Sequence, residues 1–119
     1  MWIRSAFFEG PSGQQQESAF RTAIEQEIVP AIAHLDGVMS VEMLWPQSIE
    51  DRSDHMLGQM LVRFDAESGI ARMLASEGRA AVRARVAQLS QLIDVHISHI
   101  NVSADGTRSC CRPQNRKAR

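Results

Sequence analysis

The hydrophobic pattern of this chain changes its period repeatedly, and that change constrains the fold more than any other feature. Residues 38–45 alternate between a mixed set and a mostly apolar set, which is typical of a half-buried strand. Residues 12–37 carry apolar side chains at steps of three and four, which is the spacing of one helix face. The periods predict, in order, a strand (2–9), a helix (12–37), two strands (38–45 and 55–64), a helical layer (65–93) and a strand (95–102).

Local signals set the limits of the helical segments. Ser12 and Gln15 fit a capping box, in which each side chain accepts a hydrogen bond from a free backbone N–H of the first turn. Pro30 lacks a backbone N–H and lies within the apolar stripe, so we expect a kink or a break just before it. Asp65 and Ser76 are suited to cap two successive helices in the second helical layer.

This order of elements matches the split βαβ motif of ferredoxin-like α+β folds, with helices on one face of a four-stranded antiparallel sheet. When the drier residues of each strand are assigned to the helices, a mixed apolar and charged face remains on the other side. Such a face on a small protein is typical of an interface. Two sheets packed face to face would enclose a barrel-like interior, so we predict a homodimer that forms a dimeric α+β barrel. The residues predicted to face outward are Trp2, Arg4, Phe8, Val38, Glu42, Leu44, Leu57, Gln59, Leu61 and Arg63.

Length and charge narrow the range of partners. The chain has 119 residues and a net charge of −1, which fits one domain with no overall attraction to nucleic acid or to an acidic membrane. Its apolar stretches have the length of strands, well below the roughly 20 residues of a membrane-spanning helix. No pattern of a signal peptide is found, so we expect a cytoplasmic protein.

The periodicity ends near residue 103. The prediction is therefore one domain over residues 1–103 and a basic, disordered tail over residues 104–119. Cys110 and Cys111 are adjacent in this tail, and that spacing does not supply the disulfide framework of a small secreted domain. They are interpreted as two ordinary thiols, with a vicinal disulfide or a redox role as the alternative.

Two regions of the sequence resemble the EthD-like family, which is named after a gene product linked to ethyl tert-butyl ether degradation. Residues 74–82 (LASEGRAAV), followed by residues 95–97 (VHI), are similar to the second half of that family. Pro30 and residues 35–38 (LDGV) resemble the end of its first helix and the entry to its second strand. The similarity extends over about residues 2–102 and rests mostly on packing residues.

The resemblance implies a dimeric α+β barrel, similar in shape to antibiotic-synthesis monooxygenases, muconolactone isomerases and dye-decolourising peroxidases. Members of the family often carry a His two positions before the Pro of the first helix, where this chain has Ile28, so no role of that His is carried over. No cofactor and no metal are expected, because the four histidines lack the spacings that hold a metal or a haem.

The histidines of the last predicted strand are candidates for proton transfer. His96 and His99 lie three residues apart, so they point to opposite faces of a strand and do not share one ligand site. His99 is the predicted catalytic residue, as a proton shuttle whose ordinary pKa lies near neutral. The alternative is a structural His that is held by hydrogen bonds.

Charged side chains on three predicted strands suggest an anion site. Arg4 and Arg63 are predicted to hold a carboxylate or phenolate through paired donors, with Arg63 in the catalytic set. The alternative is a buried ion-pair network with Glu42. The further candidates for substrate binding are Glu42, Gln59, Leu61 and Trp45, the last by stacking on an aromatic ligand or, alternatively, as a core side chain.

Three functions are consistent with these residues. The first is a small dimeric protein that binds a hydrophobic or aromatic metabolite in its barrel, as a cofactor-independent oxidoreductase, monooxygenase or isomerase, or as a catabolic accessory protein. The second is a non-catalytic ligand-binding or assembly module of the same fold. The third is a haem-dependent oxygenase or peroxidase.

Overall fold

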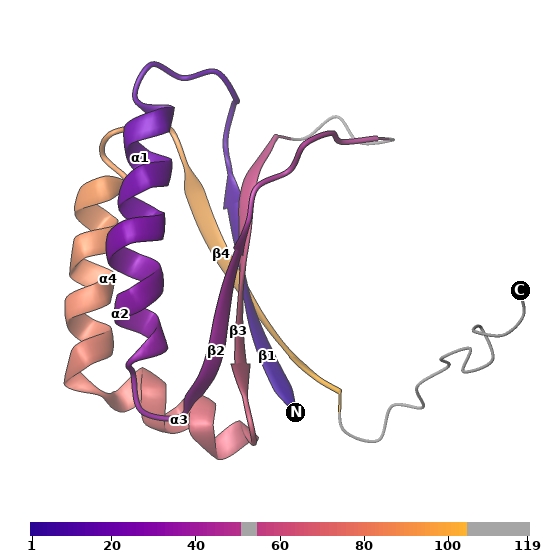
Figure 1. Cartoon of the computed structure of the whole chain (residues 1–119), viewed down its shortest axis with the longest axis vertical. Coiled ribbons are helices and arrows are strands. Elements are labelled where there is room, and N and C mark those ends of the chain that lie inside the picture. Colours follow the sequence, from indigo (N-terminus) through magenta and orange to yellow (C-terminus); the bar gives the residue numbers. More distant parts are fainter. Residues whose placement is uncertain (51–54, 105–119) are drawn as a thin grey trace, which may run out of the picture.

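A computed structural model describes residues 1–50 and 55–104 of the chain. Its four strands form one antiparallel sheet in the order β2-β3-β1-β4 (Figure 1). This confirms the predicted β-α-β-β-α-β order. The elements are β1 (Trp2–Glu9), α1 (Glu17–Ala23), the π-helical turn η1 (Ile24–Ile28), α2 (Val29–Ala33), β2 (Val38–Leu44), β3 (Met56–Phe64), α3 (Glu67–Ala75), α4 (Glu77–Leu89) and β4 (His96–Ser103).

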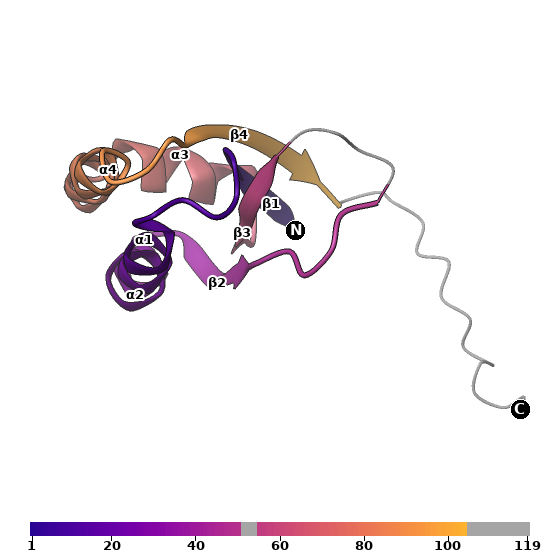
Figure 2. The ribbon, with the colours of Figure 1, turned by 90° about the horizontal axis from the view of Figure 1, so that it is seen from above.

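The helices cover one face of the sheet and leave the other bare. The rod formed by α1, η1 and α2 lies beside α4 on the same side of the sheet (Figures 1 and 2). Phe20, Ile24 and Phe64 are completely buried between the layers, and the Phe8 ring meets Phe20 edge to face at 6.1 Å. No helix in residues 1–50 and 55–104 is long and apolar enough to cross a membrane.

The irregularity expected before Pro30 is confirmed as a π-helical turn. The turn η1 ends at Ile28, and Pro30 lies in the first turn of α2, where a missing N–H is tolerated. The wider π-helical turn accommodates the residue that lacks a backbone N–H, so the helical rod continues instead of breaking.

Two of the predicted caps are wrong and one is confirmed. The Ser12–Gln15 capping box does not form, because the Glu17 carboxylate accepts hydrogen bonds from the backbone N–H groups of Gly13 and Gln14 at 2.8 and 3.3 Å instead. Helix α3 begins after Ala66 without a side-chain cap, so Asp65 has no such role. Ser76 does cap α4, since its hydroxyl oxygen accepts a hydrogen bond from the backbone N–H of Arg79 at 3.2 Å.

Replacing Ser76 by Ala is expected to lower the free energy of unfolding by about 1 kcal/mol, the usual loss for an N-cap. The hydroxyl also donates to the Met73 carbonyl at 2.7 Å, so it connects the end of α3 to the start of α4. Urea denaturation checks the value. Ser76→Thr is the control, because it keeps the hydroxyl and should retain most of the stability.

The assignment of residues to the two faces is wrong for β1, and it is correct for β2 and β3 except at Val38 and Leu57. In β1, Arg4 pairs with Val62 and Asn101, and Ala6 pairs with Met60 and His99, so all of these face the helices. A strand with apolar residues on both faces has no hydrophobic period that distinguishes the two faces. The charge of Arg4 was used to assign it to the outward face, and that assignment is wrong. The residues predicted to face outward that lie on the helix side are Trp2, Arg4, Phe8, Val38 and Leu57, the last two beside β-bulges.

The bare face, called the open face below, combines apolar residues with one ion pair. Leu44, Ile100 and Val102 are exposed there by 42%, 52% and 44%. Arg63 and Glu42 form a salt bridge across β3 and β2. The open face consists of Ile3, Ser5, Phe7, Ser40, Glu42, Leu44, Gln59, Leu61, Arg63, Ser98, Ile100 and Val102.

The predicted basic tail and its two cysteines, Cys110 and Cys111, lie outside the described residues, apart from Ala104.

Candidate functional site

A cavity of about 380 Å³ lies between the helix side of the sheet and the helices. Its floor contains Ala6 at the centre of β1, whose small side chain leaves space that a larger residue would fill. On α4 the apolar stripe is incomplete, because Val82 and Val86 share it with Arg79 and Arg83, so this helix does not close tightly over the sheet. The apolar lining consists of Ala6, Phe8, Ile28, Ile32, Leu35, Met60, Val62, Met73, Val82, Val86 and Ile97.

The polar lining is basic. It consists of Arg4 from β1, Arg79 and Arg83 from α4, and His99 from β4. Arg4 donates a hydrogen bond to the Asn101 side-chain oxygen at 3.0 Å, which fixes its direction along the sheet. Among the residues that the structure describes, no carboxylate lines this cavity. The site therefore has an apolar body and a positively charged part.

The surroundings of His99 keep its ring neutral at physiological pH. Burial first, and then the positive charges of Arg4, Arg79 and Arg83, together lower the His99 pKa to about 4. The side chain remains partly exposed, so a solute reaches it. The pKa of Arg4 is also lowered, by burial first and by Arg79 second. A neutral imidazole has one nitrogen that accepts a proton or a hydrogen bond.

The structure separates the residues that were predicted to form one site. His99 and Arg4 line the cavity, whereas Arg63 and Glu42 lie on the open face with Gln59 and Leu61. The sheet stands between the two groups, so a single constellation of Arg4, Glu42, Arg63 and His99 is wrong.

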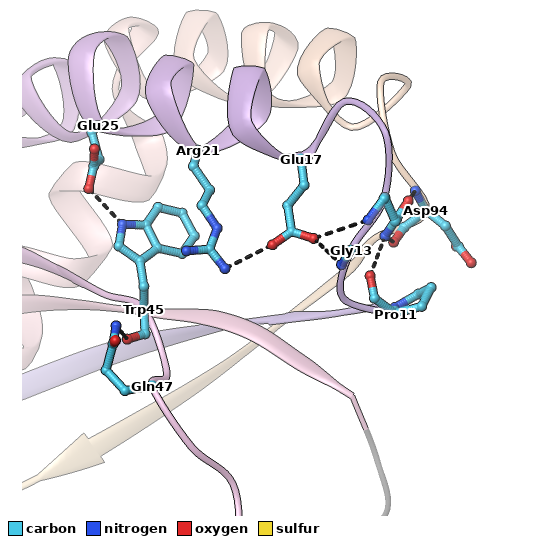
Figure 3. Close-up of polar contacts among 9 residues, drawn as sticks. Pro11, Gly13, Glu17, Arg21, Glu25, Trp45, Gln47 and Asp94 are labelled. Atoms are coloured by element: carbon cyan, nitrogen blue, oxygen red, sulfur yellow. Dashed lines mark hydrogen bonds and ion pairs between the residues drawn. The ribbon is translucent and has the colours of Figure 1, made fainter.

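Trp45 directly follows β2 and is not among the residues that line the cavity. Its side chain lies beside Glu25 and Arg21 (Figure 3). Its indole N–H donates to the Glu25 carboxylate at 2.6 Å, and the Arg21 guanidinium lies 4.8 Å from the ring centroid. Arg21 in turn donates to Glu17 at 2.8 Å. Because Gly58 packs directly against the ring, with no room for a Cβ, Trp45 joins the sheet to α1 and η1 as a packing residue.

Sequence reasoning missed Arg79 and Arg83. The predicted stripe of α4 contained its apolar positions alone. The sequence contains a signal that could have found the two arginines. Arg79 and Arg83 are four residues apart and alternate with Val82 and Val86 at steps of three and one, so all of them share one helix face. Within the described part of the chain, no group of three or more His, Cys, Asp or Glu side chains is placed to hold a metal ion.

Solved structures with the same arrangement of elements decide the fold. An EthD family protein from Bacillus halodurans has a TM-score of 0.64 at 12% identity and covers 82% of this chain and 96% of its own. A dimeric protein from Bacteroides fragilis, with a ferredoxin-like fold and unknown function, has a TM-score of 0.64 at 7% identity and covers 86% and 94%. The chain has a ferredoxin-like fold.

The ferredoxin-like fold expected from the resemblance to EthD-like proteins is thereby confirmed, and the pairing of two copies stays a prediction. A third neighbour is SnoaB from Streptomyces nogalater, a cofactor-independent oxygenase, with a TM-score of 0.60 at 15% identity and coverage of 89% of this chain and 94% of its own. No protein-family model and no curated protein matches the sequence. At identities of this size the likeness establishes the fold and no activity.

Proposed function

We propose that the protein binds a small, largely apolar molecule in the cavity between sheet and helices and acts on it without a cofactor, with His99 as proton acceptor. The observation that carries this proposal is a neutral His at the wall of an apolar cavity that also contains three arginines. The cavity is within the range of about 300–1,000 Å³ that is usual for small-molecule sites. The fold is shared with a cofactor-independent oxygenase, which is consistent with such chemistry.

The supported step is proton transfer from the substrate. The free ring nitrogen of His99 takes the proton of an acidic O–H or C–H group, and the bonding electrons stay on the substrate as a phenolate or enolate. The arginines stabilise that anion, so they lower the pKa of the substrate as well as that of His99. The extent of proton transfer depends on the difference between the pKa of the substrate and that of His99. The resulting electron-rich anion is the form that oxidation or isomerisation requires.

We also propose that two copies pair through their open faces. The support is the exposed apolar surface of β2 and β4 and the dimeric state of the Bacteroides fragilis neighbour. In this arrangement the open face provides the contact between copies, while each copy keeps its own cavity on the helix side. Arg63 and Glu42 then stabilise the interface as an ion pair and do not contact the substrate.

The proton-acceptor role is tested with 1-naphthol, whose anion absorbs at longer wavelength than the neutral form. At pH 7.5 the protein is expected to bind 1-naphthol and to raise its ionised fraction several-fold. His99→Gln should keep binding and lose the part of the extra ionisation that depends on proton transfer to the imidazole, because glutamine accepts a hydrogen bond but not the proton. His96→Gln, on the other face of β4, is the matched control.

The outcomes separate the two functions. Binding with unchanged ionisation in all three proteins would overturn the catalytic role and leave the non-catalytic binding module. Absence of binding, or binding unaffected by Val86→Trp, which fills the cavity from α4, would overturn the cavity as the site.

A further inference from the structure

We propose that the natural ligand of this cavity carries a permanent negative charge, such as a carboxylate, that is held by Arg79 and Arg83 together with Arg4. This inference rests on the proposed function, since it names the chemical class of the molecule bound at the same site. The ligand is thus an amphipathic anion, with its apolar body on the floor of the sheet.

The arginines that line the cavity differ from the other described arginines in their ion pairs. In residues 1–50 and 55–104, every arginine outside the cavity is paired with a carboxylate, and the three that line it are not. Arg4 has only the neutral Asn101 as a side-chain partner, and the Arg79 and Arg83 guanidinium groups have none among the described residues. The four pairs outside are Arg21–Glu17, Arg63–Glu42, Arg72–Asp36 and Arg85–Glu27.

The positive side chains converge on the cavity from two sides. Arg79 and Arg83 are one helical turn apart on α4, and they face the sheet where Arg4 and His99 lie on neighbouring strands. Positive groups collected from two elements around one cavity repel one another unless an anion lies between them. Guanidinium groups bind a carboxylate through two parallel hydrogen bonds, so this arrangement is well suited to such a head group.

The remaining walls of the cavity are apolar. The rod of η1 and α2 contributes Ile28 and Ile32, and β3 contributes Met60 and Val62, all of which are apolar. The charged end of the ligand is therefore directed toward α4 and β1, and its apolar part lies under the rod. A neutral ligand of the same shape would leave the arginines unpaired.

The experiment compares two fluorescent probes that share one aromatic frame. 1-Anilinonaphthalene-8-sulfonate is an anion, and N-phenyl-1-naphthylamine is its neutral counterpart. The full-length protein is titrated with each, as are the double variant Arg79→Gln/Arg83→Gln and the control Arg85→Gln, which removes one positive charge from another face of α4. Thermal melts confirm that all variants are folded.

The expected result is that the double variant binds the anionic probe about tenfold more weakly, which corresponds to one charge-assisted hydrogen bond. Its affinity for the neutral probe should not change, and Arg85→Gln should leave both affinities as in the original protein. Equal effects on both probes, or no effect on the anion, would overturn the inference while leaving the cavity as a binding site. If Val86→Trp fails to reduce binding of either probe, the proposed function itself fails.

Discussion

Replacing Leu61 by Asp is expected to prevent the proposed pairing of two copies and to leave a monomer at micromolar concentration. Leu61 lies at the centre of the open face, paired with Ser5 on one side and Glu42 on the other. An aspartate there would be buried against the second copy without a partner, beside the carboxylate of Glu42. Burial of an unpaired charge costs about 3–5 kcal/mol, and the two-fold symmetry of a dimer introduces the charge twice.

Light scattering coupled to gel filtration measures the change directly. Leu92→Asp is the matched control: Leu92 is exposed by 43% beyond the end of α4, so the same chemical change there should leave the dimer intact. The monomer should remain folded, because the core lies on the other side of the sheet. A Leu61→Asp protein that stays dimeric would show that the open face is not the interface.

The same variant separates assembly from binding. The cavity lies on the helix side, so the monomer is expected to bind the anionic naphthalene probe with unchanged affinity.

The Arg63–Glu42 pair provides a related comparison. In a monomer both side chains are partly exposed, and such a pair contributes only about 0–1 kcal/mol. A larger loss of stability in Arg63→Leu would therefore come from the pair being covered by a second copy.

The sequence predicted the order of elements because their periods are distinct, and it failed where the period carried little information. Strand β1 has Phe7 on one face and Phe8 on the other, so its apolar pattern did not place Arg4. The bulges beside Leu57 and Val38 change the parity of β3 and β2, which simple alternation ignores. The capping box of Ser12 and Gln15 was predicted wrongly for another reason. The Glu17 carboxylate competes with these two side chains for the backbone N–H donors at the start of the helix.

The candidate site was predicted only in part. His99 was correctly placed on the opposite face from His96, because three residues along a strand always reverse the side. Which of these faces held the cavity depended on the side that the helices cover, where Arg79 and Arg83 of α4 line the cavity with His99. The ligand was expected between two sheets, but the cavity lies between the sheet and its own helices.

Acidification is expected to destabilise the folded protein through His99 well before most carboxylates titrate. The His99 pKa is about 4 in the folded state against an ordinary value of 6.5. As the pH falls from 6.5 toward 4, the unfolded chain takes up a proton that the folded chain does not. The stability present above pH 6.5 is thus lost over this interval, on the order of 1–2 kcal/mol after allowance for the solvent exposure of the ring.

Chemical denaturation at several pH values tests this expectation, with His99→Gln as the variant that lacks the titrating group. The difference in unfolding free energy between the two proteins should change between pH 6.5 and 4, and it should be constant above pH 7. His96→Gln should follow the original protein throughout. Saturation with the anionic probe should reduce the acid-induced loss, because a negative charge beside Arg4, Arg79 and Arg83 raises the His99 pKa. Parallel curves for the original protein and His99→Gln would contradict the neutral, desolvated imidazole on which the proton-acceptor role depends.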